Sequence, residues 1–348
     1  MKLKSASLLA LLILAFSQEA HSCTIPVFRY ALDRWPADPY GLAVNDQWVR
    51  SDAGEAFMKE LGDLAYRFQL VPADKAPGQI DLLLPAAGSV SIWSGKADAR
   101  NLKEIATSPA RKEVAAGILA GNSAVWVVVR SGNRHADQEF ESRLSKRLEY
   151  LQSVAAIPPQ DPFDPESRLG PGPELRVGFK MVIVDRNAPT EAMFIKMLLG
   201  PDGAELLSSG VPFAAPVFGR GRVLGVFTEE QLDNEGIDEL TLFLLGACSC
   251  QVKAQNPGWD LLLDTDWDAE LTRITMAAER ETASKLTDMK TPQVSEPKAQ
   301  TPEMVVFSGP VKESEKPAKN SPKPARELVL GLGLLTLLGI WLGWKSGN

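Results

Sequence analysis

A run of uncharged, mostly apolar residues begins at Leu328 and ends at Trp344, almost at the end of the chain. As a helix rising about 1.5 Å per residue, the run would reach roughly 26 Å, which is enough to cross a bilayer with little tilt. Trp341 lies where an aromatic belt would meet the headgroups. We therefore expect a transmembrane helix over 327–345, followed by a cytoplasmic tail at 346–348.

The first residues, 1–22, have the pattern of a secretory signal peptide. A positively charged start precedes an apolar run over 6–16, which is too short to span a bilayer. Ala20-His21-Ser22 then supplies small residues at the two positions that signal peptidase reads. We expect cleavage before Cys23. An alternative is acylation of Cys23, as in a lipoprotein, although Ala20 stands where a lipobox usually carries leucine.

These two ends together predict an exported protein, anchored in the cytoplasmic membrane with its body in the periplasm or outside. Charge alone would reverse this orientation, because three basic residues precede the last helix and only Lys345 follows it. We expect export of the N-terminus to outweigh that bias, which makes the last helix a stop-transfer segment. Gly339 and Gly343 are spaced so that two such helices could approach closely and form a homodimer.

Proline content and composition divide the rest of the chain. Six prolines within 157–173 interrupt any helix or central strand. They predict a linker over 158–173, which could be an ordered spacer or a flexible one. From about residue 280 large apolar side chains become rare, so we expect a disordered stalk over 280–326. The formal charge of −7 argues against a nucleic-acid-binding protein.

Alternating strand and helix patterns predict an α/β domain over 23–157. Ser108-Pro109 has the form of a helix start, and Asp52 with Glu55 resembles a capping box before another helix. A third helix is expected over 137–154. The expected strands are 41–44, 66–71, 80–84, 90–93 and 124–129, of which the last has the composition of a central strand.

A second, shorter α/β domain is predicted over 174–279. Its expected elements are a strand at 175–184, a helix at 189–199, a hairpin at 217–227 and a final helix that includes 237–244. This order matches the C-terminal half of a thioredoxin-like fold, and the first domain can be drawn as a fuller, irregular version of it. Ferredoxin-like packing would fit almost as well. The prediction is therefore two consecutive thioredoxin-like or ferredoxin-like α/β domains.

Two long motifs carry a resemblance to a known family. The segments CTIPVFRYALDRW at 23–35 and CSCQVKAQNPGWDLL at 248–262 resemble an uncharacterised family of exported, membrane-anchored bacterial proteins. The resemblance extends over roughly residues 23–270. It implies a place in the bacterial cell envelope and no established activity.

The candidate site residues are the three cysteines of these motifs, Cys23, Cys248 and Cys250. In an oxidising compartment two of them could form a disulfide, but three thiols cannot all pair within one chain. If the last helix continued through Cys250, the side chains of Cys248 and Cys250 would point about 200° apart. If instead it ended near Gly246 and the chain extended, both sulfurs would face one side and Cys23 could meet either.

We consider three hypotheses for the chemical role of these thiols. A bridge from Cys23 to Cys248 or Cys250 would be a structural staple. A leftover thiol could exchange with such a bridge, as in a redox relay. Three thiolates together could bind copper(I).

Other catalytic and metal-binding chemistry lacks its residues. The acidic stretch 264–268 copies the first ligand positions of a calcium loop, but Ala269 stands where glycine makes the turn and Thr275 where a glutamate should close the site. No C-x-x-C is present, and His135 is the only histidine left after cleavage. We assign no catalytic residue, no cofactor and no metal site.

The expected function is therefore that of a membrane-tethered ectodomain, more an interaction protein than an enzyme, that binds or supports another envelope protein or complex. The alternative is a thiol-redox or copper-handling protein that uses Cys23, Cys248 and Cys250.

Overall fold

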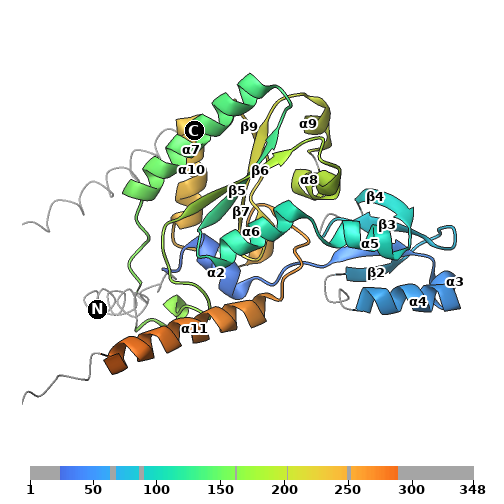
Figure 1. Cartoon of the computed structure of the whole chain (residues 1–348), viewed down its shortest axis with the longest axis horizontal. Helices are drawn as coiled ribbons and strands as arrows, with labels where there is room; N and C mark the ends of the chain where they lie inside the picture. The colour runs from blue at the N-terminus through green and yellow to red at the C-terminus, as the bar shows by residue number, and fades with distance from the viewer. Residues whose placement is uncertain are drawn as a thin grey trace, which may run out of the picture. The chain divides into compact units, whose positions relative to one another are not determined.

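Two β-sheets with flanking helices make up the computed structural model, a mixed α/β architecture as predicted (Figure 1). The structure describes residues 24–62, 68–85, 90–160, 163–201, 203–248 and 252–288. The predicted signal peptide, the transmembrane helix and the stalk from residue 289 lie outside the described residues. Within those described ranges, no helix is both long and apolar enough to cross a membrane.

The smaller sheet has the strand order β2-β1-β3-β4. Its strands are β1 (Tyr40–Val44), β2 (Phe68–Pro72), β3 (Gln79–Leu83) and β4 (Ser91–Lys96). Helices α3 (Asp46–Val49) and α4 (Asp52–Leu61) follow β1, and α5 (Ala99–Ala106) follows β4. The N-cap of α4 is Ser51, whose hydroxyl accepts a hydrogen bond from the Gly54 N–H at 3.3 Å, so the cap lies one residue before the predicted one.

The larger sheet has the order β10-β8-β7-β5-β6, with β9 also paired to β7. Its strands are β5 (Ala124–Arg130), β6 (Phe179–Asp185), β7 (Phe213–Phe218), β8 (Arg222–Val223), β9 (Phe227–Thr228) and β10 (Trp259–Asp260). As predicted, β5 is a central strand, and every side chain from Ala124 to Val129 is fully buried. A strand with two buried faces needs a nearly continuous apolar run, which this segment has.

The two sheets repeat one topology. In each, the first strand (β1 or β5) pairs parallel with the second (β2 or β6) and, on its other side, antiparallel with the third (β3 or β7). The fourth strand (β4 or β8) pairs antiparallel with the third. The parallel pairs need crossover helices, which α4 and α7 (Arg134–Val154) supply.

The larger sheet crosses the predicted domain boundary at 158–173. Strand β5 precedes this segment, whereas its partners β6 and β7 both follow it. The division between the two sheets therefore falls between β4 and β5. The prolines mark a long connection inside one sheet, and the sequence pattern does not reveal which strands pair across it.

The proline-rich segment is bound along helix α2 (Val27–Arg34) and is an ordered spacer over its described residues. Arg29 is 3% exposed, and its guanidinium donates hydrogen bonds to the carbonyl oxygens of Pro173 at 2.5 Å and Gly170 at 2.7 Å. The Asp33 carboxylate accepts a hydrogen bond from the Gly170 N–H at 2.8 Å and lies 2.9 Å from Arg29.

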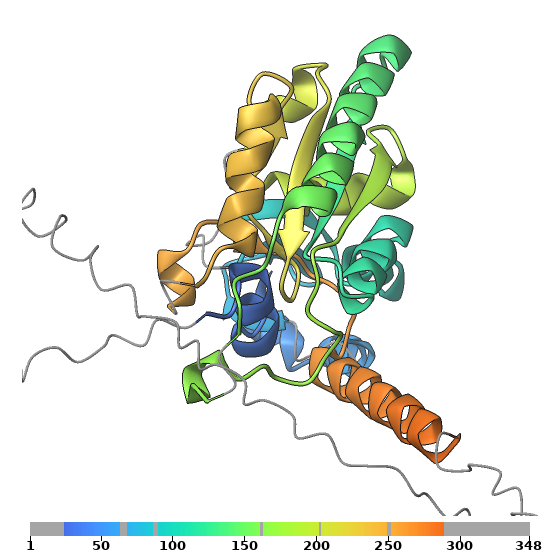
Figure 2. The same cartoon turned by 90° about the vertical axis from the view of Figure 1, so that its left-hand side faces the viewer.

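Two apolar clusters hold the helices on the sheets. One cluster joins the smaller sheet to α6 (Pro109–Leu119) and α8 (Ala192–Leu199), which pack with β5. The other joins the opposite side of β5 to α2, α7 and α10 (Asn234–Leu245). Figure 2 shows α7 and α10 side by side. The short helix α9 (Ala204–Ser208) follows α8.

Helix α11 (Trp267–Asp288) ends the described chain. Trp267 and Leu271 are buried, whereas the side chains over 276–285 are exposed. The prediction of disorder from residue 280 is therefore wrong for residues 280–288, which are helical. Their low apolar content is compatible with disorder, but it also suits a solvated helix.

Candidate functional site

The two sequence motifs meet beside Cys248. Helix α10 ends at Leu245 and Gly246 is extended, so the chain follows the second of the two paths considered for this segment. Ala247 forms an antiparallel bridge with Pro26, and the Cys248 N–H donates a hydrogen bond to the Ile25 carbonyl oxygen at 2.9 Å. The structure thereby brings the start of the first motif against the start of the second.

Cys248 is the one candidate thiol that lies within the described residues, and it is 2% exposed in the cluster around α2 and α10. Burial among apolar side chains disfavours the thiolate, which is the reactive form of cysteine. Cys23 and Cys250 lie outside the described residues. Ile25, Val27 and Phe28 of the first motif belong to the same buried cluster as Cys248.

Asp260 is a buried carboxylate of the second motif. It is 2% exposed, and its Oδ1 accepts a hydrogen bond from Arg222 at 3.2 Å. Its Oδ2 accepts from Lys253 at 2.5 Å and from the Asp38 N–H at 2.7 Å. The Tyr40 hydroxyl donates to the Asp260 carbonyl oxygen at 3.0 Å. Two cations and two further donors therefore hold this residue, which ends β10, against the segment that enters β1.

Arg222 completes this charged network. Its guanidinium is buried, lies 5.8 Å from the Trp35 ring centroid and donates hydrogen bonds to the carbonyl oxygens of Pro257 at 3.0 Å and Asn256 at 2.8 Å. It thus holds the segment 256–257 that leads into β10. Buried charges that are paired and hydrogen-bonded in this way hold a structure together and leave no group open to a substrate.

A cavity of about 360 Å³ adjoins this network, lined in part by Asp38, Arg220, Asp266 and Asp268. Arg220 donates to Asp268 at 2.8 Å, and Asp266 Oδ1 accepts from the Ala269 N–H at 3.1 Å at the start of α11. Asp266 therefore caps the start of α11, and Asp268 pairs with Arg220. No group of three or more His, Cys, Asp or Glu residues that could hold a metal ion occurs in the part of the chain that the structure describes.

A larger groove has a volume of about 890 Å³. One side is formed by β4, a strand of the smaller sheet, and by α5, which follows it. The other side is formed by α6, α8 and the short 3-10 helix η3 (Pro189–Glu191). Four basic residues line it: Arg100, Lys103, Lys112 and Lys196. One acidic residue, Glu104, lines it as well and lies 3.2 Å from Arg100. We call this feature the basic groove.

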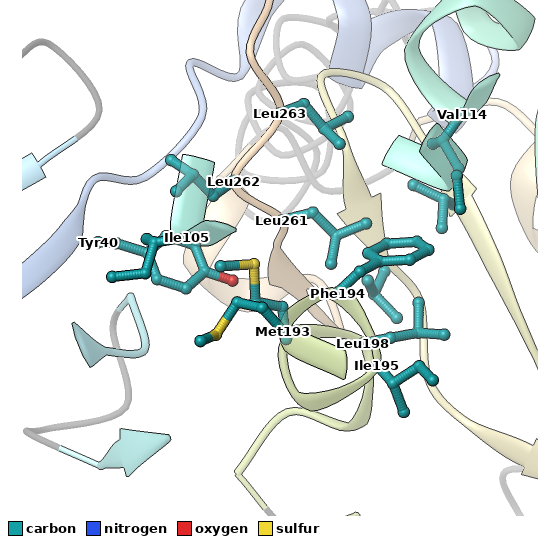
Figure 3. Packing of buried hydrophobic residues seen from close by; sticks show 14 of the residues in the cluster. Tyr40, Ile105, Val114, Met193, Phe194, Ile195, Leu198, Leu261, Leu262 and Leu263 are labelled. Atoms are coloured by element: carbon teal, nitrogen blue, oxygen red, sulfur yellow. The ribbon is translucent and has the colours of Figure 1, made fainter. Parts of the chain in front are cut away.

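The wall of the basic groove also contains apolar side chains. Trp93 is half-buried on β4, and Met193 is 9% exposed on α8. Figure 3 shows Met193 in the cluster that includes Tyr40, Ile105 and Leu262. The groove thus combines an apolar wall with a basic rim at the junction of two sheets, which is a common position for ligand sites.

A buried arginine fixes the helices behind the groove. Arg111 is 2% exposed, and its guanidinium donates to the carbonyl oxygens of Ile105 at 2.6 Å and Glu104 at 3.0 Å, at the C-terminal end of α5. Burial lowers the pKa of Arg111 to about 10, while Tyr40 and Glu191 oppose that shift. Glu191 in turn accepts a hydrogen bond from the Ala110 N–H at 3.0 Å, which joins η3 to the start of α6.

Neither the basic groove nor the Asp260 network was predicted from the sequence. The four basic residues of the groove belong to three helices, and no local pattern connects them. Lys253 and Asp260 lie inside the second motif, and this was the only sequence feature that pointed to the Asp260 network. His135 lies in the first turn of α7 with its side chain 91% exposed.

Neither protein-family models nor the curated proteins contain a match to this chain.

Proposed function

We propose that the protein is a membrane-tethered ectodomain of the bacterial cell envelope, without catalytic activity, that binds or supports another envelope protein. The basic groove is the observation that carries this proposal. It is open, it lies at the junction of two sheets, and Lys103, Lys112 and Lys196 on its rim form no ion pair with any residue that the structure describes. The buried charged residues Arg111, Arg222 and Asp260, in contrast, are occupied by structural hydrogen bonds.

We also infer that the two sheets are thioredoxin-like domains in tandem. The repeated topology supports this, since a thioredoxin-like fold joins a parallel strand pair to an antiparallel hairpin and a following helix. Ferredoxin-like packing fits less well, because its neighbouring strands all run antiparallel. In a dithiol oxidoreductase the cysteines follow the first strand and begin the helix. Ser131-Gly132-Asn133 occupies that place after β5, which supports a role in binding.

The experiment is site-specific photo-crosslinking of the full-length protein in its own membranes. A photoreactive amino acid at Thr190, an exposed residue of the groove, is compared with one at Tyr150, a 51% exposed residue of α7 outside it. We expect a discrete protein adduct from Thr190 alone. Adducts only to lipid and abundant bystander proteins at both positions would contradict the proposal.

Thiol exchange or copper handling by Cys23, Cys248 and Cys250 is the second candidate function. It is favoured by the Pro26–Ala247 bridge, because the chain on one side of the bridge leads to Cys23 and the chain on the other side leads through Cys248 to Cys250. Alkylation and mass spectrometry of the mature protein, before and after mild reduction, test it. Interconverting bridges would support exchange, whereas one bridge that resists reduction would leave a structural staple.

A further inference from the structure

The basic groove has a charge opposite to that of the whole molecule. Arg100, Lys103, Lys112 and Lys196 face a single carboxylate, Glu104, while the full chain carries a formal charge of −7. Glu104 and Arg100 are 61% and 86% exposed, and such a solvated pair neutralises little of the rim. The start of α6 also lines the groove at Pro109, but its Ala110 N–H already bonds the Glu191 carboxylate, so the favourable charge comes from the four basic side chains. The groove therefore favours an anionic occupant.

The arrangement of these cations indicates an extended occupant. All four basic side chains are exposed on the rim and come from α5, α6 and α8. A site for one phosphate or carboxylate group would instead need buried donors that converge on it. Separate, solvated cations suit a chain that presents several negative charges in succession, and they favour its encounter and register.

The apolar wall adds a second requirement. Trp93 and Met193 lie within the same cavity as the basic rim, and Met193 is only 9% exposed. A flat lipid surface would meet the exposed rim but not a recessed side chain. A peptide can place one large apolar side chain in the recess while its carboxylates remain at the rim.

We propose that the basic groove binds an extended acidic peptide segment of a partner protein, with Asp or Glu residues on both sides of one large apolar side chain. This inference rests on the proposed binding function and specifies the chemistry of the partner. The hydrogen bonds of Arg111 and Glu191 hold α5, α6 and η3 together behind the groove, so the site is formed before the peptide arrives.

The test uses the full-length protein in detergent and a labelled peptide with a central Phe between two Glu-rich flanks, measured by fluorescence anisotropy. The groove variant carries Lys103→Glu, Lys112→Glu and Lys196→Glu. A matched control carries Lys59→Glu, Arg134→Glu and Lys146→Glu, which are exposed positions outside the groove with the same change in net charge. Both variants must melt like the unchanged protein, as surface substitutions usually do.

We expect the groove variant to weaken binding at least about tenfold and the control variant less than about twofold, with affinity falling as salt is raised. Replacing Glu by Gln or Phe by Ala in the peptide should each weaken binding. Equal loss in both variants, or equal binding of the Gln peptide, would overturn the proposal. Equal competition by inorganic phosphate, or by vesicles rich in anionic lipid, would also overturn it.

The crosslinking experiment distinguishes this inference from the broader function. If Thr190 still captures a discrete protein in the groove variant, the acidic-peptide inference fails while the binding function stands. If Thr190 captures no discrete protein in the unchanged chain, the binding function itself fails.

Discussion

The Arg111 guanidinium donates a hydrogen bond to the Leu262 carbonyl oxygen at 3.2 Å, which ties the start of α6 to the segment that follows β10. The same side chain also bonds the last turn of α5. One buried cation thus joins three segments that are far apart in the sequence, and it does so through backbone acceptors.

Arg111→Met should therefore destabilise the protein by about 3 kcal/mol or more, because several buried carbonyl oxygens lose their donor. Urea denaturation of the purified chain measures this loss. Lys112→Met, at the next and exposed position, is the control and should change stability by less than about 0.5 kcal/mol. Equal stability of the two variants would show that the carbonyl groups find other partners.

Because Tyr40 is buried, we expect the protein to lose stability in alkali. Burial raises the pKa of Tyr40, Arg111 lowers it and Asp260 raises it, and the net pKa lies well above the usual range. Since the folded state keeps the phenol neutral, its stabilisation is complete below about pH 10, the usual tyrosine pKa, and declines above it as the unfolded chain ionises. Between pH 8 and pH 11 the protein should lose about 1 kcal/mol more than Tyr40→Phe does. Parallel pH slopes for the two proteins in urea melts would contradict this.

Asp260→Asn should be among the most damaging single changes in the described chain. It would leave Arg222 and Lys253 without their buried counter-charge, at a cost of about 3 to 5 kcal/mol. Asp268→Asn is the matched control, because Asp268 also pairs with an arginine but is 81% exposed. We expect that control to lose less than about 1 kcal/mol. Thermal melts of both variants measure the two stability losses. Equal losses would show that burial of the carboxylate does not determine the cost of removing its charge.

The proline-rich segment should detach when its anchor on α2 is removed. In Arg29→Ala, residues 168–173 lose the donor to Gly170 and Pro173, and local opening should become easier. Hydrogen exchange should then accelerate in this segment while β5 remains protected. Arg34→Ala, which removes one exposed hydrogen bond to the Arg168 carbonyl oxygen, is the control and should have little effect. Unchanged exchange in Arg29→Ala would mean that the prolines alone hold the segment.

Local signals account for the elements that were predicted correctly. Ser108 caps α6 and Pro109 is its first residue, as the pair indicated, because the side chain and the fixed φ act within one turn. The continuous apolar run of β5 indicated a buried central strand, because a strand covered on both faces needs apolar side chains on each of them. The turn at Gly219-Arg220-Gly221 joins β7 to β8, since glycines at both ends adopt the positive φ that it requires.

Strand pairing and charge clustering were beyond these local signals. The sequence by itself determined the α/β class, the central position of β5 and the start of α6, because each depends on residues within one turn or one strand. Only the tertiary structure decided that β5 pairs across the prolines with β6, that Asp260 is buried between cations, and that the basic residues of α5, α6 and α8 share one groove. These depend on contacts between residues far apart in the chain, and the free energy of such contacts is set by packing that no single segment contains.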